Sequence, residues 1–120
     1  ILDLRTIAPL DWPSVFESVA KTGRVLVLDT GTTTGSVAGE IVARIAGECW
    51  DVLKCAPQRL AMPDYPESTS FALTADYHIR AEHVVAKVGQ MLGRTIDTES
   101  LVTQREHPHD VPGDWFNGPF

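Results

Sequence analysis

The stretch from Val25 to Ser36 holds the residues of this chain whose types and spacing could do chemistry. Asp29, Thr30 and Gly31 form the Asp-Thr-Gly triplet of aspartic-protease catalytic loops, in which two aspartates share a proton. An acidic residue followed by glycine and threonines also fits the phosphate-binding turn of sugar kinases and actin-like ATPases. A third interpretation is structural: a buried strand ends here and a helix begins.

Neither catalytic interpretation fits the surrounding sequence. A protease of this kind needs two triplets, and the chain contains one, so the second would have to come from another copy. Such proteases are nearly all β, and the ATPase turn joins two antiparallel strands, whereas the segment after Thr34 has the apolar spacing of a helix. The ATPase interpretation also needs a second phosphate loop and far more chain than 120 residues. We therefore expect no catalytic residue here.

A more general role of this loop, as an anion site or an interface, stays open. A turn rich in glycine and threonine before a helix N-terminus presents backbone N–H groups to an anion, and ligands of open α/β sheets gather at the carboxyl ends of strands. The loop lacks a Walker lysine and the three-glycine dinucleotide spacing, so we expect no dedicated nucleotide site. The candidate loop consists of Asp29, Thr30, Gly31, Thr32, Thr33, Thr34, Gly35 and Ser36. In the alternative, the threonines and Ser36 cap the helix while Asp29 bonds neighbouring backbone.

The remaining reactive side chains predict no metal site and no cofactor-binding residue. Cys49 and Cys55 are six positions apart, and the four histidines do not complete a zinc site with them. Cys49 falls on the apolar face of a predicted helix and Cys55 just after it, so we expect two reduced, buried thiols. His107 and His109 lie in a proline-rich tail, where their spacing fits a solvated segment.

The elements that position the loop follow from the apolar spacing. We expect strands at residues 1–5, 25–28 and 58–62, and helices between Asp11 and Gly23, at 36–53 and at 79–92. The continuously apolar run from Val25 to Leu28 predicts a strand buried on both faces, at the centre of a parallel sheet. Residues 63–77 predict a long surface loop with a turn of helix. The alternating order predicts an α/β fold with a mostly parallel sheet.

Composition and charge exclude several classes of protein. The length of 120 residues allows one compact domain, and the formal net charge of −6 without a basic stripe disfavours nucleic-acid binding. The longest apolar run is too short to cross a membrane. The chain starts at Ile1 in a strand-like segment, so we expect it to be processed or cut from something longer. In the tail, Trp115, Phe116 and Phe120 need cover, and we expect them to contact a partner.

Several segments in order carry a family resemblance. They are Asp3 to Asp11 ("DLRTIAPLD"), Asp29 with Gly31 after the second strand, the helix start Gly35 to Ile41, "RLAMPDYP" from Arg59 to Pro66, and "AEHVVAKVGQML". In this order the chain resembles the C-terminal domain of transketolase-like thiamine-diphosphate enzymes, and most of all that of the E1 β subunit of 2-oxo acid dehydrogenases. The resemblance covers residues 1–93, so we expect a family domain there and a C-terminal extension at 94–120. It implies a three-layer, Rossmann-like α/β sandwich.

The resemblance implies a domain without catalytic residues inside a larger enzyme. Thiamine diphosphate and Mg²⁺ would be held by the pyrimidine- and diphosphate-binding domains or subunits. This domain would serve subunit association in a dimer or heterotetramer and dock an E2 acyltransferase, in the cytoplasm or the mitochondrial matrix. The full assembly would catalyse oxidative decarboxylation or ketol transfer. The alternative is a free-standing anion-binding or protein-interaction module of the same fold.

Overall fold

The computed structural model describes residues 1–109, 111 and 117–118, and the chain forms two compact units, Ile1–Asp64 and Tyr65–Phe120. The first unit contains helix α1 (Trp12–Thr22), strand β1 (Leu26–Thr32), helix α2 (Val37–Glu48), the 3-10 helix η1 (Trp50–Val52) and strand β2 (Gln58–Met62). The second contains the 3-10 helix η2 (Phe71–Leu73) and helices α3 (Ala81–Met91) and α4 (Glu99–Thr103). The predicted domain boundary at residues 93 and 94 stays a prediction.

Helix α1 begins and ends at the residues that the sequence marks. The Asp11 carboxylate accepts hydrogen bonds from the backbone N–H and the hydroxyl of Ser14, which caps the first turn. Gly23 ends the helix with a left-handed φ of 67°, and its N–H donates to the carbonyl of Val19. A Cβ at Gly23 would lie 2.7 Å from the carbonyl oxygen of Val52, so glycine is required both for its φ and for this close approach.

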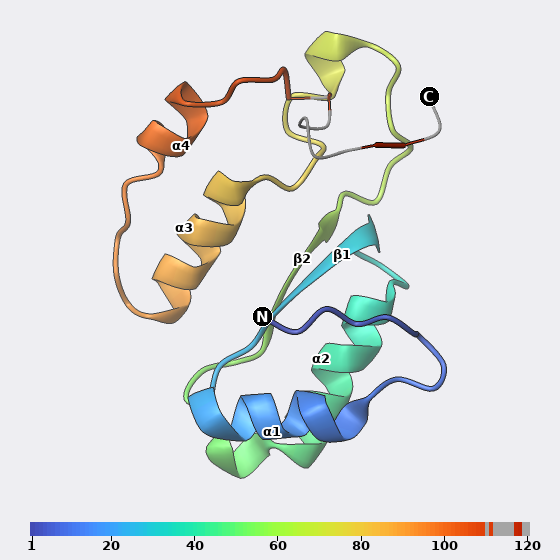
Figure 1. Cartoon of the computed structure of the whole chain (residues 1–120), viewed down its shortest axis with the longest axis vertical. Helices are drawn as coiled ribbons and strands as arrows, with labels where there is room; N and C mark the ends of the chain where they lie inside the picture. The colour runs from blue at the N-terminus through green and yellow to red at the C-terminus, as the bar shows by residue number, and fades with distance from the viewer. Residues whose placement is uncertain (110, 112–116, 119–120) are drawn as a thin grey trace. The chain divides into compact units, whose positions relative to one another are not determined.

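Strands β1 and β2 form a parallel two-stranded sheet, and α2 connects them (Figure 1). A parallel pair needs a crossover long enough to return the chain to the same end of the sheet, and a helix provides it. The predicted α/β class with a parallel sheet is confirmed, and so are the three predicted helices, with the last shortened to Ala81–Met91. The predicted helix at 36–53 ends at Glu48, and the chain continues as η1.

The core of the first unit lies between α1, α2 and one face of the sheet. It is built from the buried residues Leu10, Val15, Val19, Ile41, Ile45 and Cys49, against which Val25, Val27 and other apolar side chains pack. Along β1 burial alternates instead of being continuous, and Leu28 is 54% exposed. The prediction of a strand buried on both faces was therefore wrong, because the helices of this unit pack on the face that carries Val27 and not on the face that carries Leu28.

The predicted strand at residues 1–5 was also wrong. These residues are exposed and belong to no helix or strand. Asp3 and Arg5 form an exposed ion pair at 2.9 Å, and the hydroxyl of Thr6 donates to the carbonyl of Pro9. Alternating apolar residues suit a strand only where a neighbouring strand pairs with the backbone, and within the described part of the chain β1 and β2 pair only with each other.

The second unit is built around α3. At its first turn, Nδ1 of His83 accepts a hydrogen bond from the backbone N–H of Arg80 at 2.9 Å. Helix α4 follows in a segment for which no periodic element was expected, and it packs against α3. Thr74 and Gly89 are the buried residues in the described part of this unit. Among the residues that the structure places, no helix is both long and apolar enough to pass through a membrane.

Candidate functional site

The Asp-Thr-Gly triplet lies at an irregularity in strand β1. Leu28 pairs with Leu60 across the parallel ladder, and the next pair is Thr32 with Met62. From 28 to 32 the first strand advances four positions, whereas from 60 to 62 the second advances two, so residues 29–31 form a bulge-like interruption. Beyond it, the N–H and the hydroxyl of Thr33 both donate to the carbonyl of Met62, at 2.7 and 2.9 Å. The loop is thus fixed to the end of β2.

Asp29 is the central residue of this loop. Its Oδ1 accepts the backbone N–H of Gly31 at 2.8 Å, and its Oδ2 accepts that of Ala38, in the first turn of α2, at 2.9 Å. The N–H of Gly31 has the largest effect on the pKa of Asp29 and lowers it from 3.8; partial burial opposes this, and the N–H of Ala38 adds to the lowering. Asp29 is therefore an ionised carboxylate that connects the interruption in β1 to the start of α2.

Gly31 leaves little room for a side chain. A Cβ at this position would lie 3.2 Å from Oδ1 of Asp29 and 3.2 Å from Cβ of Ser36. Both contacts are tighter than ordinary packing, so a larger residue would push against the carboxylate that organises the loop. The need for glycine at position 31 follows from the close approach of Asp29 and Ser36, and it requires no bound substrate.

Asp64 holds the far side of the loop, and sequence reasoning missed it. Its Oδ1 accepts the backbone N–H of Thr34 at 2.7 Å, and its Oδ2 accepts the hydroxyl of Thr34 at 2.7 Å. These bonds, led by that from the Thr34 N–H, lower the pKa of Asp64 from 3.8. The signal available in the sequence was an acidic residue two positions after the third predicted strand, because the carboxyl ends of parallel strands meet at one edge of the sheet.

The helix start is capped by Asp29 and not by Ser36. Ser36 occupies the N-cap position of α2 but makes no side-chain hydrogen bond to the first turn. The prediction that Ser36 and the threonines cap the helix was therefore wrong, whereas the prediction that Asp29 bonds neighbouring backbone is confirmed. The physical reason is that the Asp29 carboxylate already accepts the N–H of Ala38, the donor that an N-cap side chain would serve.

The loop as built does not suit a diphosphate. Three N–H groups that could face an anion, those of Gly31, Thr34 and Ala38, already donate to the chain's own carboxylates. Those carboxylates, on Asp29 and Asp64, also place negative charge where a phosphate would need positive charge. By contrast, Thr30, Thr32 and Thr34 are exposed residues at the sheet edge, and Gly35, with a φ of 81°, turns the chain toward α2.

Three of the other candidate residues are not described by the structure, and the two cysteines lie in or near the core. Trp115, Phe116 and Phe120, expected to contact a partner, lie outside the described residues. Cys49 is buried in the core and Cys55 is half-buried, and both are free thiols. Within the described ranges, no group of three or more His, Cys, Asp or Glu side chains could hold a metal ion.

The chain matches one protein-family description and several characterised subunits. The family described as "Transketolase, C-terminal domain" matches residues 1–84. The pyruvate dehydrogenase E1 component subunit beta of Mycoplasma pneumoniae is 48% identical over 60 residues, which are 50% of this chain and 18% of that protein. The 2-oxoisovalerate dehydrogenase subunit beta of Bacillus subtilis is 41% identical over 66 residues, 55% of this chain and 20% of that protein.

A third relative matches a longer part of the chain. The acetoin:2,6-dichlorophenolindophenol oxidoreductase subunit beta of Bacillus subtilis is 30% identical over 93 residues, which are 78% of this chain and 27% of that protein. The chain therefore spans about a fifth to a quarter of the length of these relatives. The three names differ in the substrate that they give, and all three are β subunits of oxidoreductases.

Proposed function

Because the chain belongs to the transketolase C-terminal domain family, we propose that it is the C-terminal domain of a thiamine-diphosphate-dependent enzyme of the 2-oxo acid dehydrogenase E1 β type. Its role is subunit association and not the chemical step. The observation that carries the proposal is the family match over residues 1–84, together with relatives that are β subunits of such dehydrogenases. The complete enzyme would act on a 2-oxo acid by oxidative decarboxylation.

The cofactor belongs to other parts of the enzyme. Thiamine diphosphate with Mg²⁺ would supply the carbanion chemistry of the complete enzyme when bound. In this chain the loop at the N-terminus of α2 is the position best suited to a diphosphate by topology. Its donors are taken by Asp29 and Asp64, so the residues present do not fit the group. We therefore place the cofactor in the pyrimidine- and diphosphate-binding domains or subunits.

The loop from Asp29 to Ser36 serves as an interface between this domain and the other domains or subunits of a dimer or heterotetramer. The carboxylate of Asp29 in the loop and that of Asp64 outside it both accept hydrogen bonds from the loop and the start of α2, which gives the loop a fixed shape. The exposed threonines at the sheet edge then present a preorganised polar surface, and a rigid loop loses little conformational entropy when it binds.

A charge at one exposed threonine tests this role. Thr30→Lys adds a cation at the exposed edge of the loop, and Thr69→Lys adds the same cation at an exposed residue of the second unit. Sedimentation of the enzyme assembled from complete subunits should show weakened association for Thr30→Lys and ordinary association for Thr69→Lys. If both variants assemble equally well while their far-ultraviolet circular dichroism is unchanged, the loop is not an interface.

Docking of an E2 acyltransferase is the second part of the proposal. The family resemblance implies such docking, and the aromatic residues of the tail, Trp115, Phe116 and Phe120, are candidates for the contact. Aromatic side chains carry a large share of the binding free energy at protein interfaces.

A further inference from the structure

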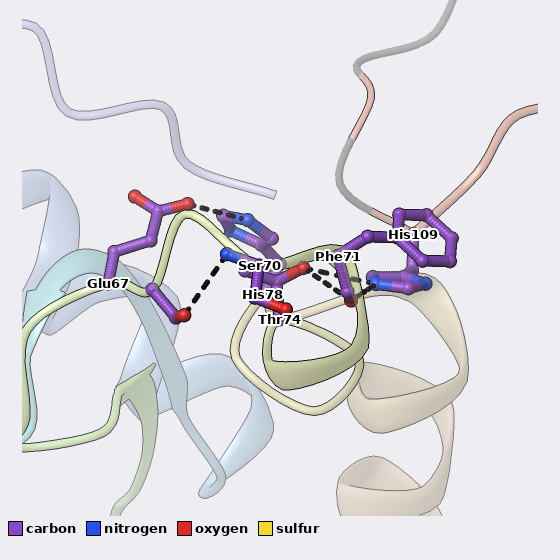
Figure 2. Close-up of polar contacts among 7 residues, drawn as sticks. Glu67, Ser70, Phe71, Thr74, His78 and His109 are labelled. Carbon is purple, nitrogen blue, oxygen red and sulfur yellow. Dashed lines mark hydrogen bonds and ion pairs between the residues drawn. The ribbon is translucent and has the colours of Figure 1, made fainter.

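The C-terminal extension is tied back to the second unit at two points. The guanidinium of Arg105 pairs with the carboxylate of Glu82 on α3, and the two side chains are only 25% and 13% exposed. Four residues later, His109 reaches the turn that contains η2 (Figure 2). These contacts span 23 positions in the first case and 35 to 38 in the second. The segment that the sequence presents as a solvated tail therefore has long-range partners.

The contacts of His109 have a defined hydrogen-bond direction. Its Nε2 lies 2.8 Å from the carbonyl oxygen of Phe71 and 3.1 Å from the hydroxyl oxygen of Thr74. A carbonyl can only accept, so Nε2 carries the hydrogen and donates. The hydroxyl of Thr74 donates its own hydrogen to the same carbonyl at 3.0 Å, so its oxygen is free to accept from His109.

The contact of His109 with the η2 turn involves one buried side chain and is accompanied by the packing of two rings. Thr74 is 4% exposed and is the buried polar side chain of the described residues. The ring of His109 packs on the ring of Phe71 with 4.1 Å between centroids, as Figure 2 shows. On the other side of the turn, the carboxylate of Glu67 pairs with Nε2 of His78 at 3.0 Å. The Thr74 hydroxyl keeps its own bond to the Phe71 carbonyl, and His109 adds one N–H donor that these two oxygens share, so its removal costs about one net hydrogen bond.

We propose that residues 105–109 form a strap that packs against the η2 turn and unfolds cooperatively with it as one local unit. The ion pair of Arg105 attaches the strap to α3, and the hydrogen bonds of His109 attach it to Phe71 and Thr74. When the strap opens, Thr74 and one face of the Phe71 ring become accessible. The strap also fixes the point from which the chain continues beyond residue 109. Residues 105–109 and the η2 turn thus form one cooperative part of the second unit.

Hydrogen exchange followed by mass spectrometry on the full 120-residue chain tests the strap. In His109→Ala, amides of residues 71–77 and of 105–109 should exchange about five- to tenfold faster, the effect of losing one net hydrogen bond, while α2 is unchanged. Glu106→Ala is the matched control, because Glu106 is exposed and forms no hydrogen bond or ion pair with the described residues. His109→Gln keeps an N–H donor and should restore most of the protection. Unchanged exchange at 71–77 in His109→Ala would overturn the proposal.

A second measurement keeps the test decisive if His109→Ala does not fold. In the natural chain, the strap and the η2 turn should open with the same free energy and the same dependence on urea concentration. Opening of 105–109 at low urea concentration, with 71–77 protected up to global unfolding, would show that the two segments are independent and would contradict the strap.

Discussion

At the irregularity within strand β1, Oδ2 of Asp29 accepts a hydrogen bond from the backbone N–H of Ala38, nine positions later and 2.9 Å away. The same carboxylate accepts the N–H of Gly31 through Oδ1. One side chain therefore shapes the bulge and caps the following helix. The Asp-Thr-Gly triplet suggests a catalytic acid in the sequence, but in this protein its aspartate connects strand β1 to helix α2.

Removal of the Asp29 carboxylate should destabilise the first unit. Asp29→Ala leaves the N–H groups of Gly31 and Ala38 without their acceptor, and we expect the free energy of unfolding to fall by about 1 kcal/mol, a typical value for a lost N-cap. Urea unfolding followed by circular dichroism measures the change. Asp51→Ala is the control, because Asp51 is an exposed carboxylate of the same unit that forms no side-chain hydrogen bond with the described part of the chain. Equal stability of the two variants would contradict the role given to Asp29.

The same carboxylate predicts how stability depends on pH. The pKa of Asp29 is lowered in the folded chain, chiefly by the N–H of Gly31, so its contribution is fully present above the unfolded value of about 3.9. As the pH falls through the lower folded pKa, the contribution is lost. Asp64 and Asp11 shift in the same direction, through hydrogen bonds from Thr34 and Ser14 respectively. Stability should thus change little between pH 7 and about pH 5 and decline below about pH 4.

Urea midpoints measured from pH 3 to pH 7 check this dependence. Asp29→Asn has no titrating group at this position, so its stability should decline less steeply in acid than that of the natural chain. A parallel decline in both proteins would assign the acid sensitivity to other groups.

A pair of glycines gives opposite predictions for the same substitution. Gly23→Ala places a Cβ at a φ of 67° and 2.7 Å from the carbonyl oxygen of Val52, and it should lower stability by about 1–2 kcal/mol or more. Gly47→Ala lies in α2 with no atom within 4 Å of the added Cβ, and it should raise stability by roughly 0.5–1 kcal/mol. Thermal unfolding of both variants measures the change in stability. A shift of the melting temperature in the same direction for both would contradict the prediction.

The tail gives a prediction about association. Deletion of residues 112–120 removes Trp115, Phe116 and Phe120 and leaves the strap residues Arg105 and His109 in place. If the aromatic residues contact a partner, the truncated chain should associate more weakly in sedimentation velocity. Replacement of the three aromatic residues by serine at full length is the control for chain length. Unchanged association in both variants would show that the tail does not contribute to the interface.

Local signals in the sequence predicted much of the first unit. Asp11 and Gly23 mark both ends of α1, and the four-residue apolar spacing that includes Ile41 and Ile45 places the buried face of α2. These features depend on contacts between near neighbours or on one amphipathic face, so a linear pattern is enough.

Features that depend on distant partners could not be predicted in the same way. The pattern of residues 1–5 does not say whether a strand lies beside them. The bond between Thr34 and Asp64 joins residues 30 positions apart, and that between His109 and Thr74 joins residues 35 apart. The sequence correctly indicated that a side chain of this loop caps the helix. The capping residue is Asp29, within β1, and not the adjacent Ser36.

Calorimetric titration of the folded 120-residue chain with thiamine diphosphate in the presence of Mg²⁺ tests the central claim most directly. If this domain serves association while other domains hold the cofactor, the titration should give no saturable heat, and far-ultraviolet circular dichroism on the same sample should show a folded α/β chain. Saturable, tight binding of thiamine diphosphate that is lost in a variant of the Asp29 loop would contradict the account, because it would place the cofactor in this domain.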